Sequence, residues 1–289
     1  MNRLHTAKRA AILQALCEGV SVRATSRLTG ASKVTILRLL ESVGAVALRY
    51  QSANHVALAT KRVQADEQWA FVFSKSRNTR PEHRDSGERG DTWTWVAIDA
   101  DHKLVISWAV GRRDMPTALV FMDDLAGRLA GRVQLTTDAL PAYLGAVEQS
   151  FGWNGVDFAR LYKVFGSSHD TGAEHRYSPP VVIRTEVQPV MGKPDPKHIS
   201  TSFVERTNLT TRMNNRRFTR LTNAHSKKLE NHKHAIALHF FYFNYCRSHM
   251  TLTAANGGVH TTPAMATGVA DHVWTLEELV NLLDNASEK

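Results

Sequence analysis

The hydrophobic positions at the start of the chain recur at helical spacing and fall into three short segments. This spacing predicts helices over residues 6–18, 22–29 and 33–43. Each segment starts at a residue that can cap a helix and is followed by a glycine. The capping residues are Thr6, Ser21 and Ser32, and the glycines are Gly19, Gly30 and Gly44. The chain is therefore expected to begin with a small all-α unit.

Two short helices joined by a tight turn with glycine are typical of a helix-turn-helix, in which the second helix presents polar residues to DNA. Here the second helix would begin at residue 33. Thr35 and Arg38 point away from the predicted core, and Lys33 lies in the exposed first turn. We take these three as candidate DNA contacts. A small dimerisation bundle of three amphipathic helices is the alternative.

Beyond residue 62 the periodicity changes to that of strands. Runs rich in β-branched and aromatic residues predict five strands, with two helices between the later ones. The strands are expected at 63–73, 93–99, 104–110, 133–137 and 158–164, and the helices at 116–129 and 141–151. Three antiparallel strands followed by alternating helices and strands is the order of a ribonuclease H-like fold. The predicted fold class is therefore α/β, with a mixed sheet behind a small helical domain.

The polar and proline-rich stretches suggest where the domains divide. Residues 75–91 read as a long loop, and residues 165–202 as an insertion before the next helix. The expected organisation is a helix-turn-helix domain at 1–48, a linker at 49–62, a catalytic domain at 63–250 and a C-terminal helical segment at 251–289.

The charge is concentrated at the start of the chain. The net charge is +9, and residues 1–65 contain ten Lys or Arg against two acidic residues, which leaves +8 in that segment. A polyanionic partner such as DNA is therefore expected at the N-terminal unit. A solvated basic surface is the alternative reading.

The remaining composition excludes several classes of protein. Cys17 and Cys246 are isolated, so neither a disulfide framework nor a Cys-rich zinc site is expected. Residues 235–245 are the most apolar stretch, but they are too few to cross a membrane. No signal peptide is visible, and we expect a cytoplasmic, nucleoid-associated protein. The aromatic run at residues 240–245 is expected to be core rather than a base-stacking platform.

Three acidic residues lie in separate contexts that a ribonuclease H-like fold would bring together. Asp66 lies inside the first predicted strand, Asp138 follows the fourth, and Glu205 lies early in a polar, Arg-rich helix. Two divalent cations about 3.5–4 Å apart can activate the attacking oxygen and stabilise the leaving oxygen of a phosphodiester. Hard cations prefer oxygen ligands. We expect these three residues to be catalytic and to bind two Mg²⁺ ions, for which Mn²⁺ would substitute.

Each carboxylate also has a structural explanation. Asp66 could be a charge that protects a strand edge, Asp138 could cap the next helix, and Glu205 could interact with a helix dipole. Asp99 is the main rival to Asp66. Its setting between two strands, Asp-Ala-Asp-His, is turn chemistry, so we assign it a structural role.

The helix that carries Glu205 is also the most basic part of the later sequence. Asn208 and Arg212 share a face with Glu205, three and seven positions on. Guanidinium groups there can grip phosphates in a bidentate manner. Arg206, Asn208, Arg212 and Arg216 are therefore candidate DNA contacts, and a solvated basic helix is the alternative.

Taken together, these residues resemble the DDE transposases of bacterial insertion sequences, most closely the insertion sequence 1 type. The resemblance rests on Asp66-Glu67-Gln68-Trp69 with Phe71-Val72, on Thr137-Asp138-Ala139 with Tyr143, and on Glu205-Arg206-Thr207-Asn208 with Arg212. It covers residues 20–250, and the combined motifs are more specific than any one alone. The family often has a Cys-rich zinc element before its helix-turn-helix, and this sequence has none.

The resemblance implies that Asp66, Asp138 and Glu205 are metal ligands and that Arg212 contacts DNA. It implies a transposase that binds the terminal repeats of its element, cleaves there and transfers the 3′-OH to target DNA. The partners would be double-stranded DNA and further copies of the chain, at least as a dimer. The alternatives are a metal-dependent nuclease or resolvase that does not join strands, and a helix-turn-helix regulator with an inactive catalytic domain.

Overall fold

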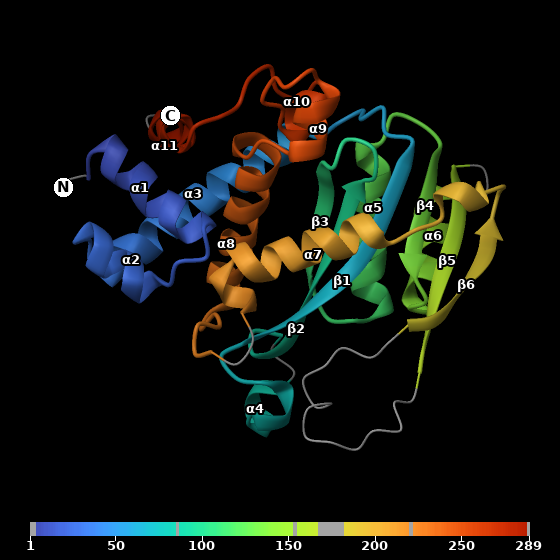
Figure 1. Cartoon of the computed structure of the whole chain (residues 1–289). Coiled ribbons are helices and arrows are strands. Elements are labelled where there is room, and N and C mark those ends of the chain that lie inside the picture. Colours follow the sequence, from blue (N-terminus) through green and yellow to red (C-terminus); the bar gives the residue numbers. More distant parts are fainter. Residues whose placement is uncertain (1–3, 85–86, 153–154, 167–181, 220–221, 288–289) are drawn as a thin grey trace.

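One mixed β-sheet organises the molecule (Figure 1). The computed structural model describes residues 4–84, 87–152, 155–166, 182–219 and 222–287. The strands of the sheet are β1 (Arg62–Val72), β2 (Gly90–Asp99), β3 (Val105–Gly111), β4 (Val133–Asp138), β5 (Val156–Phe165) and β6 (Val182–Met191). Their order in the sheet is β3-β2-β1-β4-β5-β6.

The strand directions follow the predicted pattern. Strands β1, β2 and β3 are antiparallel neighbours, whereas β4 runs parallel to both β1 and β5. This mixed arrangement is compatible with a ribonuclease H-like core. The five predicted strands and the two helices between them lie close to where the sequence places them.

Helices cover both faces of the sheet. Trp95 on β2 packs against Phe121 of α5 (Met115–Arg128) and Tyr143 of α6 (Ala142–Phe151). Val96, the next residue, turns the other way and joins a buried cluster with Val204 of α7 (Ser202–Asn214). Since neighbouring strand residues face opposite sides, α5 and α6 lie on one face and α7 crosses the other (Figure 1).

The third helix is longer than predicted. The N-terminal helices are α1 (Thr6–Cys17), α2 (Val22–Thr29) and α3 (Lys33–Asn54). Helix α3 does not end at Gly44, and the first part of the predicted 49–62 linker is helical. Gly44 instead marks a close approach to α8 (Leu229–Phe241), because a Cβ atom there would lie 2.6 Å from His234 Cβ. Glycine here serves helix packing rather than helix termination.

The insertion predicted at 165–202 also needs correction. Strand β6 lies within it and pairs antiparallel with β5, so this part of the segment extends the sheet. Residues 167–181 lie outside the described residues. The predicted 75–91 loop contains the short 3₁₀ turn η1 (Ser76–Asn78) and helix α4 (Pro81–Arg84), and β2 begins within it at Gly90. A turn η3 (Pro196–His198) leads to α7.

The C-terminal segment returns to the N-terminal helices. It contains α9 (Met250–Ala255), α10 (Pro263–Ala266) and α11 (Leu276–Ser287). Arg9 on α1 is buried and donates two 2.6 Å hydrogen bonds to Asp284 on α11. Both chain ends therefore lie on the same side of the molecule (Figure 1).

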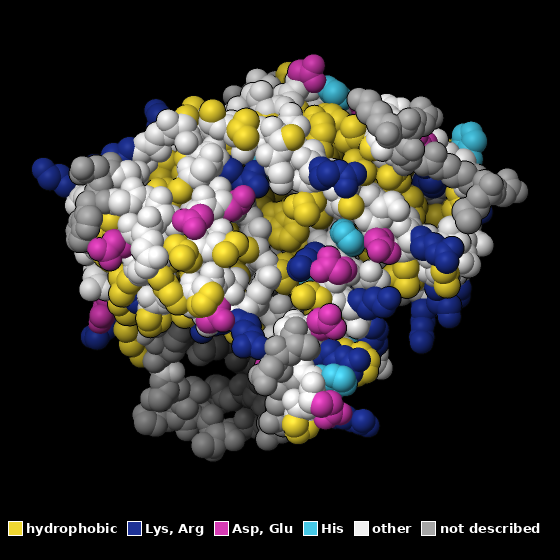
Figure 2. Space-filling view, turned by 180° about the vertical axis from the view of Figure 1, so that it is seen from behind, with side chains coloured by type: hydrophobic (Ala, Val, Ile, Leu, Met, Phe, Trp, Pro, Cys, Tyr) yellow, Lys and Arg dark blue, Asp and Glu magenta, His cyan; other side chains and the backbone are white. Residues whose placement is uncertain are grey.

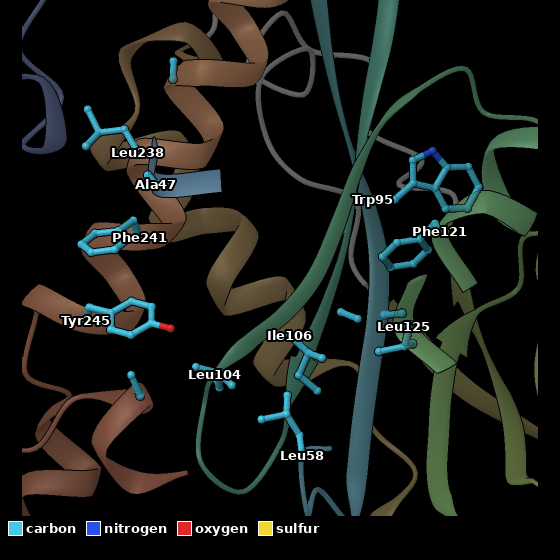
Figure 3. Close-up of a cluster of buried hydrophobic side chains, with 14 of the residues drawn as sticks. Ala47, Leu58, Trp95, Leu104, Ile106, Phe121, Leu125, Leu238, Phe241 and Tyr245 are labelled. Atoms are coloured by element: carbon cyan, nitrogen blue, oxygen red, sulfur yellow. The ribbon is translucent and has the colours of Figure 1, made fainter. Parts of the chain in front are cut away.

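A continuous core joins the helical part to the sheet. Figure 3 shows Trp95, Phe121 and Leu125 at one end and Phe241 and Tyr245 at the other. Helix α8 continues into the π-helical turn η5 (Tyr242–Cys246), and the rings of Phe241 and Tyr245 stack with centroids 4.8 Å apart. The prediction that this aromatic run forms core is confirmed, because both rings are fully buried.

Part of the positive surface charge lies beside the N-terminal helices. Lys and Arg side chains stand out along the right-hand edge of Figure 2, the side where α2 and α3 lie. Arg23, Arg27, Lys33 and Arg38 are all exposed there. Within the described part of the chain, no helix is long and apolar enough to cross a membrane.

Candidate metal centre and nucleic-acid interface

Alternate residues of β1 fasten α7 to the sheet. Gln64 Oε1 accepts hydrogen bonds from the backbone N–H groups of Phe203 (2.8 Å) and Val204 (3.1 Å), which lie in the first turn of α7. Gln68 Nε2 donates to the carbonyl of Asn208 over 3.1 Å. The helix start is thus capped from the strand, since two of its otherwise unpaired N–H groups find a partner.

Asp66 lies between these two glutamines and faces the same helix. Asn208 Nδ2 donates a 2.8 Å hydrogen bond to Asp66 Oδ2. The parallel pairing of β1 with β4 ends at Ala65 and Thr137, so the next residues, Asp66 and Asp138, are brought side by side. The sequence prediction that these two carboxylates come together is therefore matched by the register of the sheet.

A third carboxylate joins them, and it is not the one predicted. Among the described residues, the acidic group with the spacing of metal ligands consists of Asp66, Glu67 and Asp138. One oxygen of each lies within 4.8 Å of one oxygen of the others. Such a set of carboxylate oxygens suits a hard divalent cation such as Mg²⁺ or Mn²⁺. These residues could hold a metal ion.

Glu67 is buried and held by two partners from other elements. Arg113 Nε donates to Glu67 Oε1 over 2.7 Å, and the buried Tyr143 hydroxyl donates to Oε2 over 3.1 Å. Arg113 Nη2 also lies 3.5 Å from Asp138 Oδ2. One guanidinium therefore bridges two of the three carboxylates and balances part of their charge.

Crowding and burial make two of these carboxylates weak acids. Burial, helped by the nearby charges of Asp138 and Glu205, raises the pKa of Asp66 to about 6. Burial and the charges of Asp138 and Asp66 raise the pKa of Glu67 to about 7, although Arg113 opposes this. Like charges within a few ångströms disfavour ionisation of each other. A bound cation would offset the repulsion between these carboxylates when they are ionised.

Glu205 stands apart from the group of three but remains near it. Its carboxylate forms an ion pair with Lys163 of β5, and it accepts a 2.5 Å hydrogen bond from the Thr201 hydroxyl. Its charge still contributes to the raised pKa of Asp66. Its role as a metal ligand stays a prediction, and such a role would require the contact with Lys163 to open.

The structural explanations for the acidic residues can now be compared. Asp99 is fully buried and accepts hydrogen bonds from the backbone N–H groups of Asp101 (2.7 Å) and His102 (2.9 Å). The turn role assigned to it is confirmed. Asp138 Oδ1 accepts from the backbone N–H of Leu140 over 3.0 Å, so it also organises the turn before α6. Asp66 lies on the central β1 rather than on an edge strand.

The candidate DNA contacts lie in two places. Lys33 and Arg38 are exposed and Thr35 is half-buried on α3, where the Thr35 hydroxyl lies 2.8 Å from Ser32 Oγ. On and after α7, Arg206 is exposed, while Arg212 and Arg216 are half-buried. These six positions remain candidate contacts. The structure does not bring the α3 residues to the carboxylates.

Asn208 differs from the other candidates. It is 2% exposed and its amide is bonded to Asp66, so it orients a carboxylate instead of offering a surface to DNA. Sequence reasoning placed it correctly on the face of Glu205 but gave it a different role. The difference arises because that face of α7 packs on β1, and a buried amide must bond within the protein.

Sequence reasoning gave no site role to Glu67, Arg113, Tyr143 or Lys163. Glu67 adjoins Asp66 in the Asp-Glu-Gln-Trp motif, but strict alternation along a strand predicts that it faces away from Asp66. Arg113 follows β3 by two residues and Lys163 lies in β5, and neither position carries a local sign of its partner. The available signals were the adjacency of Glu67 to Asp66 and the place of Glu67 and Tyr143 in the motifs that carry the resemblance.

Comparisons with known proteins do not identify a family for this chain. No protein-family model and no curated protein matches the chain. Among solved structures, it is similar to chains of the Mos1 strand transfer complex (TM-score 0.22, 14% identity) and of a pre-cleavage Mos1 transpososome (TM-score 0.21, 13% identity). Each match covers 54% of this chain, and the chain spans 58% and 59% of those chains. Likeness at this level carries no argument about the site.

Proposed function

We propose that this chain is a DNA transposase that binds the ends of a mobile element, cleaves there and transfers the 3′-OH to target DNA. The observation that carries the proposal is the meeting of Asp66 and Asp138 on adjacent parallel strands, with the Glu205 helix bonded to Asp66 through Asn208. Divalent cations bound by these carboxylates would activate the attacking oxygen and stabilise the leaving oxygen of the phosphodiester. We expect two Mg²⁺ ions held by Asp66, Asp138 and Glu205.

The chain's own residues supply position and charge. Asn208 fixes the Asp66 carboxylate by a hydrogen bond, and Arg113 contacts both Glu67 and Asp138. Arg206 and Arg212 on α7 and Arg216 in the turn that follows it are candidate contacts for the strand being cut. Lys33, Thr35 and Arg38 would contact the terminal repeat from the helix-turn-helix of residues 1–48. At least a dimer is expected, because two element ends must be paired.

The test is a strand-transfer assay with the full chain, Mg²⁺ and the terminal DNA that flanks its gene. We expect joined products from the native protein and none from Asp138→Ala or Asp66→Ala, while both variants still bind the DNA. Normal joining by Asp138→Ala would refute the site. Cleavage without joining would favour a nuclease or resolvase.

The helix-turn-helix regulator is the second candidate, and the exposed basic residues of α2 and α3 favour it. It predicts DNA binding that weakens steeply with salt and no cleavage in Mg²⁺ or Mn²⁺. The intact carboxylate group argues against it, since crowding three acidic side chains is costly unless a cation binds them.

A further inference from the structure

A cavity lies away from the carboxylates, between the N-terminal helices and the segment that follows α7. This cavity has a volume of about 550 Å³. Its apolar wall includes Leu16 of α1, Leu37 and Leu40 of α3, and Leu238 of α8. The cavity is within the size range of sites for drug-sized ligands, which extends from about 300 to 1,000 Å³.

The charged side chains of the described residues that line this cavity are all positive. Within the described part of the chain, five cationic side chains line the cavity and no Asp or Glu does. They are Arg23, Lys33, Arg216, Arg217 and Lys227. Cations gathered without counter-ions repel one another, so an anion bound among them would be stabilised.

Arg217 is the most informative of these residues. It is half-buried in the 3₁₀ turn η4 (Arg216–Phe218), and burial lowers the pKa of its guanidinium. No carboxylate of the described residues forms an ion pair with it. A buried charge is normally paired, so the cavity is the natural place for its partner.

His239 adds a second unsatisfied group. It lines the cavity, is 4% exposed, and its Nε2 lies 3.1 Å from Thr211 Oγ1. Its Nδ1 has no hydrogen-bond partner. Burial lowers the pKa of His239 to about 4, so the ring is neutral and adds no charge to the cavity.

We propose that this cavity binds one nucleotide, with its phosphate among Arg216, Arg217 and Lys227 and its base against the leucine wall. A bare phosphate would leave the apolar wall unused, whereas a nucleotide combines an anion with a flat body that packs on apolar side chains. The nucleotide is either free or an unpaired residue of a DNA strand. Only the second source rests on the proposed function.

The test measures nucleotide affinity without any cleavage. Calorimetry with the full chain, in EDTA, compares deoxyadenosine monophosphate with inorganic phosphate. We expect the nucleotide to bind at least about tenfold more tightly than phosphate, which corresponds to about 1.4 kcal/mol. Arg217→Met and Lys227→Met should each weaken nucleotide binding about tenfold or more. Arg27→Met is the matched control, because Arg27 is exposed on α2 and does not line the cavity.

A second arm identifies the source of the nucleotide. Duplex DNA with one unpaired terminal nucleotide is compared with a flush duplex, again in EDTA. A preference for the unpaired end that Lys227→Met removes would assign the cavity to a DNA strand. Binding of the free nucleotide without that preference would assign it to a free ligand.

Three results would overturn the inference. They are equal affinity for phosphate and nucleotide, unchanged binding in Lys227→Met, and absence of both nucleotide binding and preference for the unpaired end. Lys227 is exposed, so its variant decides the question even if Arg217→Met unfolds. A chain that binds the nucleotide but never cuts DNA would refute the proposed function alone, and a chain that cuts DNA but fails here would refute this inference alone.

Discussion

Asn208 donates a 2.8 Å hydrogen bond to Asp66 and thereby ties α7 to the carboxylate in the middle of β1. The backbone carbonyl of Asn208 accepts a second bond from Gln68, so both the side chain and the backbone of this residue are bonded to β1. The helix that carries Glu205 is therefore positioned by the strand that carries Asp66. The candidate metal site therefore depends on two elements that lie about 140 residues apart in the chain.

Asn208→Ala is expected to weaken divalent-cation binding by about 10–100-fold, the usual effect of losing a residue that orients a metal ligand. The Asn208 bond also lowers the pKa of Asp66, so this pKa should rise in the variant. Calorimetric titration with Mn²⁺ measures the first effect. Met213→Ala, an exposed change on the same helix, is the control. Equal Mn²⁺ affinity in Asn208→Ala and the native chain would contradict the role given to Asn208.

The raised pKa values predict how stability varies with pH. Asp66 and Glu67 have pKa values of about 6 and about 7 in the folded chain, above their ordinary 3.8 and 4.5. Between about pH 4 and 7 the folded state then binds more protons than the unfolded state. The free energy of unfolding should therefore fall as pH rises through that window.

A bound cation requires these groups to be deprotonated, so it competes with protons. Mg²⁺ should raise the melting temperature more at about pH 8 than at about pH 5.5. Thermal unfolding at both pH values measures this difference. The double variant Asp66→Asn/Asp138→Asn should not show this Mg²⁺-dependent difference in melting temperature. An equal rise at both pH values in the native chain would count against the site.

Arg113→Met should destabilise the fold by about 1–3 kcal/mol, because it removes the hydrogen-bonded cation of a buried carboxylate. The pKa of Glu67 should rise further, since Arg113 holds it down. In the variant, a protonated Glu67 carries no unpaired charge, whereas an ionised Glu67 does. The loss in the free energy of unfolding should therefore be larger at about pH 8 than at about pH 5. Urea unfolding of Arg113→Met and of the exposed neighbour Arg112→Met compares the two. A loss that does not change with pH would contradict this explanation.

Gly44→Ala should be destabilising although alanine is the better helix former. Its Cβ would lie 2.6 Å from His234 Cβ and 2.7 Å from its Cα, so α3 and α8 would have to separate. Overpacking of this kind costs about 1–3 kcal/mol. Gly127→Ala in α5 is the matched control, because nothing lies within 4 Å of its Cβ and a gain of about 0.5–1 kcal/mol is expected. Similar melting temperatures for the two variants would show that the helices do not touch at Gly44.

Gly44 illustrates what the sequence can and cannot predict about the helices. Periodicity located the five strands and the helices between them because their apolar residues pack into the core. It ended the third helix at Gly44, since a glycine that stops a helix and one that admits a neighbouring helix look the same in one chain. Strand β6 was missed because prolines and charges surround a segment whose exposed residues show little alternation.

The sequence also predicted one part of the candidate site and left another part out. Asp66 and Asp138 each stand in or after a strand, so the topology alone brings them together. Glu67 was overlooked because its partners, Arg113 and Tyr143, come from distant elements and give no local signal. Asn208 was placed on the correct helix face, but its role depends on what that face packs against.

The central claim is that this carboxylate group performs metal-dependent phosphodiester chemistry. The most direct measurement is cleavage of end-labelled terminal DNA in Mg²⁺ or Mn²⁺ by the native chain, Asp138→Asn and Asp123→Asn. Asparagine preserves the size of the side chain and removes its charge, and Asp123 is exposed on α5 outside the acidic group. We predict cleavage by the native chain and Asp123→Asn, and a loss of at least about 100-fold in Asp138→Asn. Undiminished cleavage by Asp138→Asn would contradict the claim.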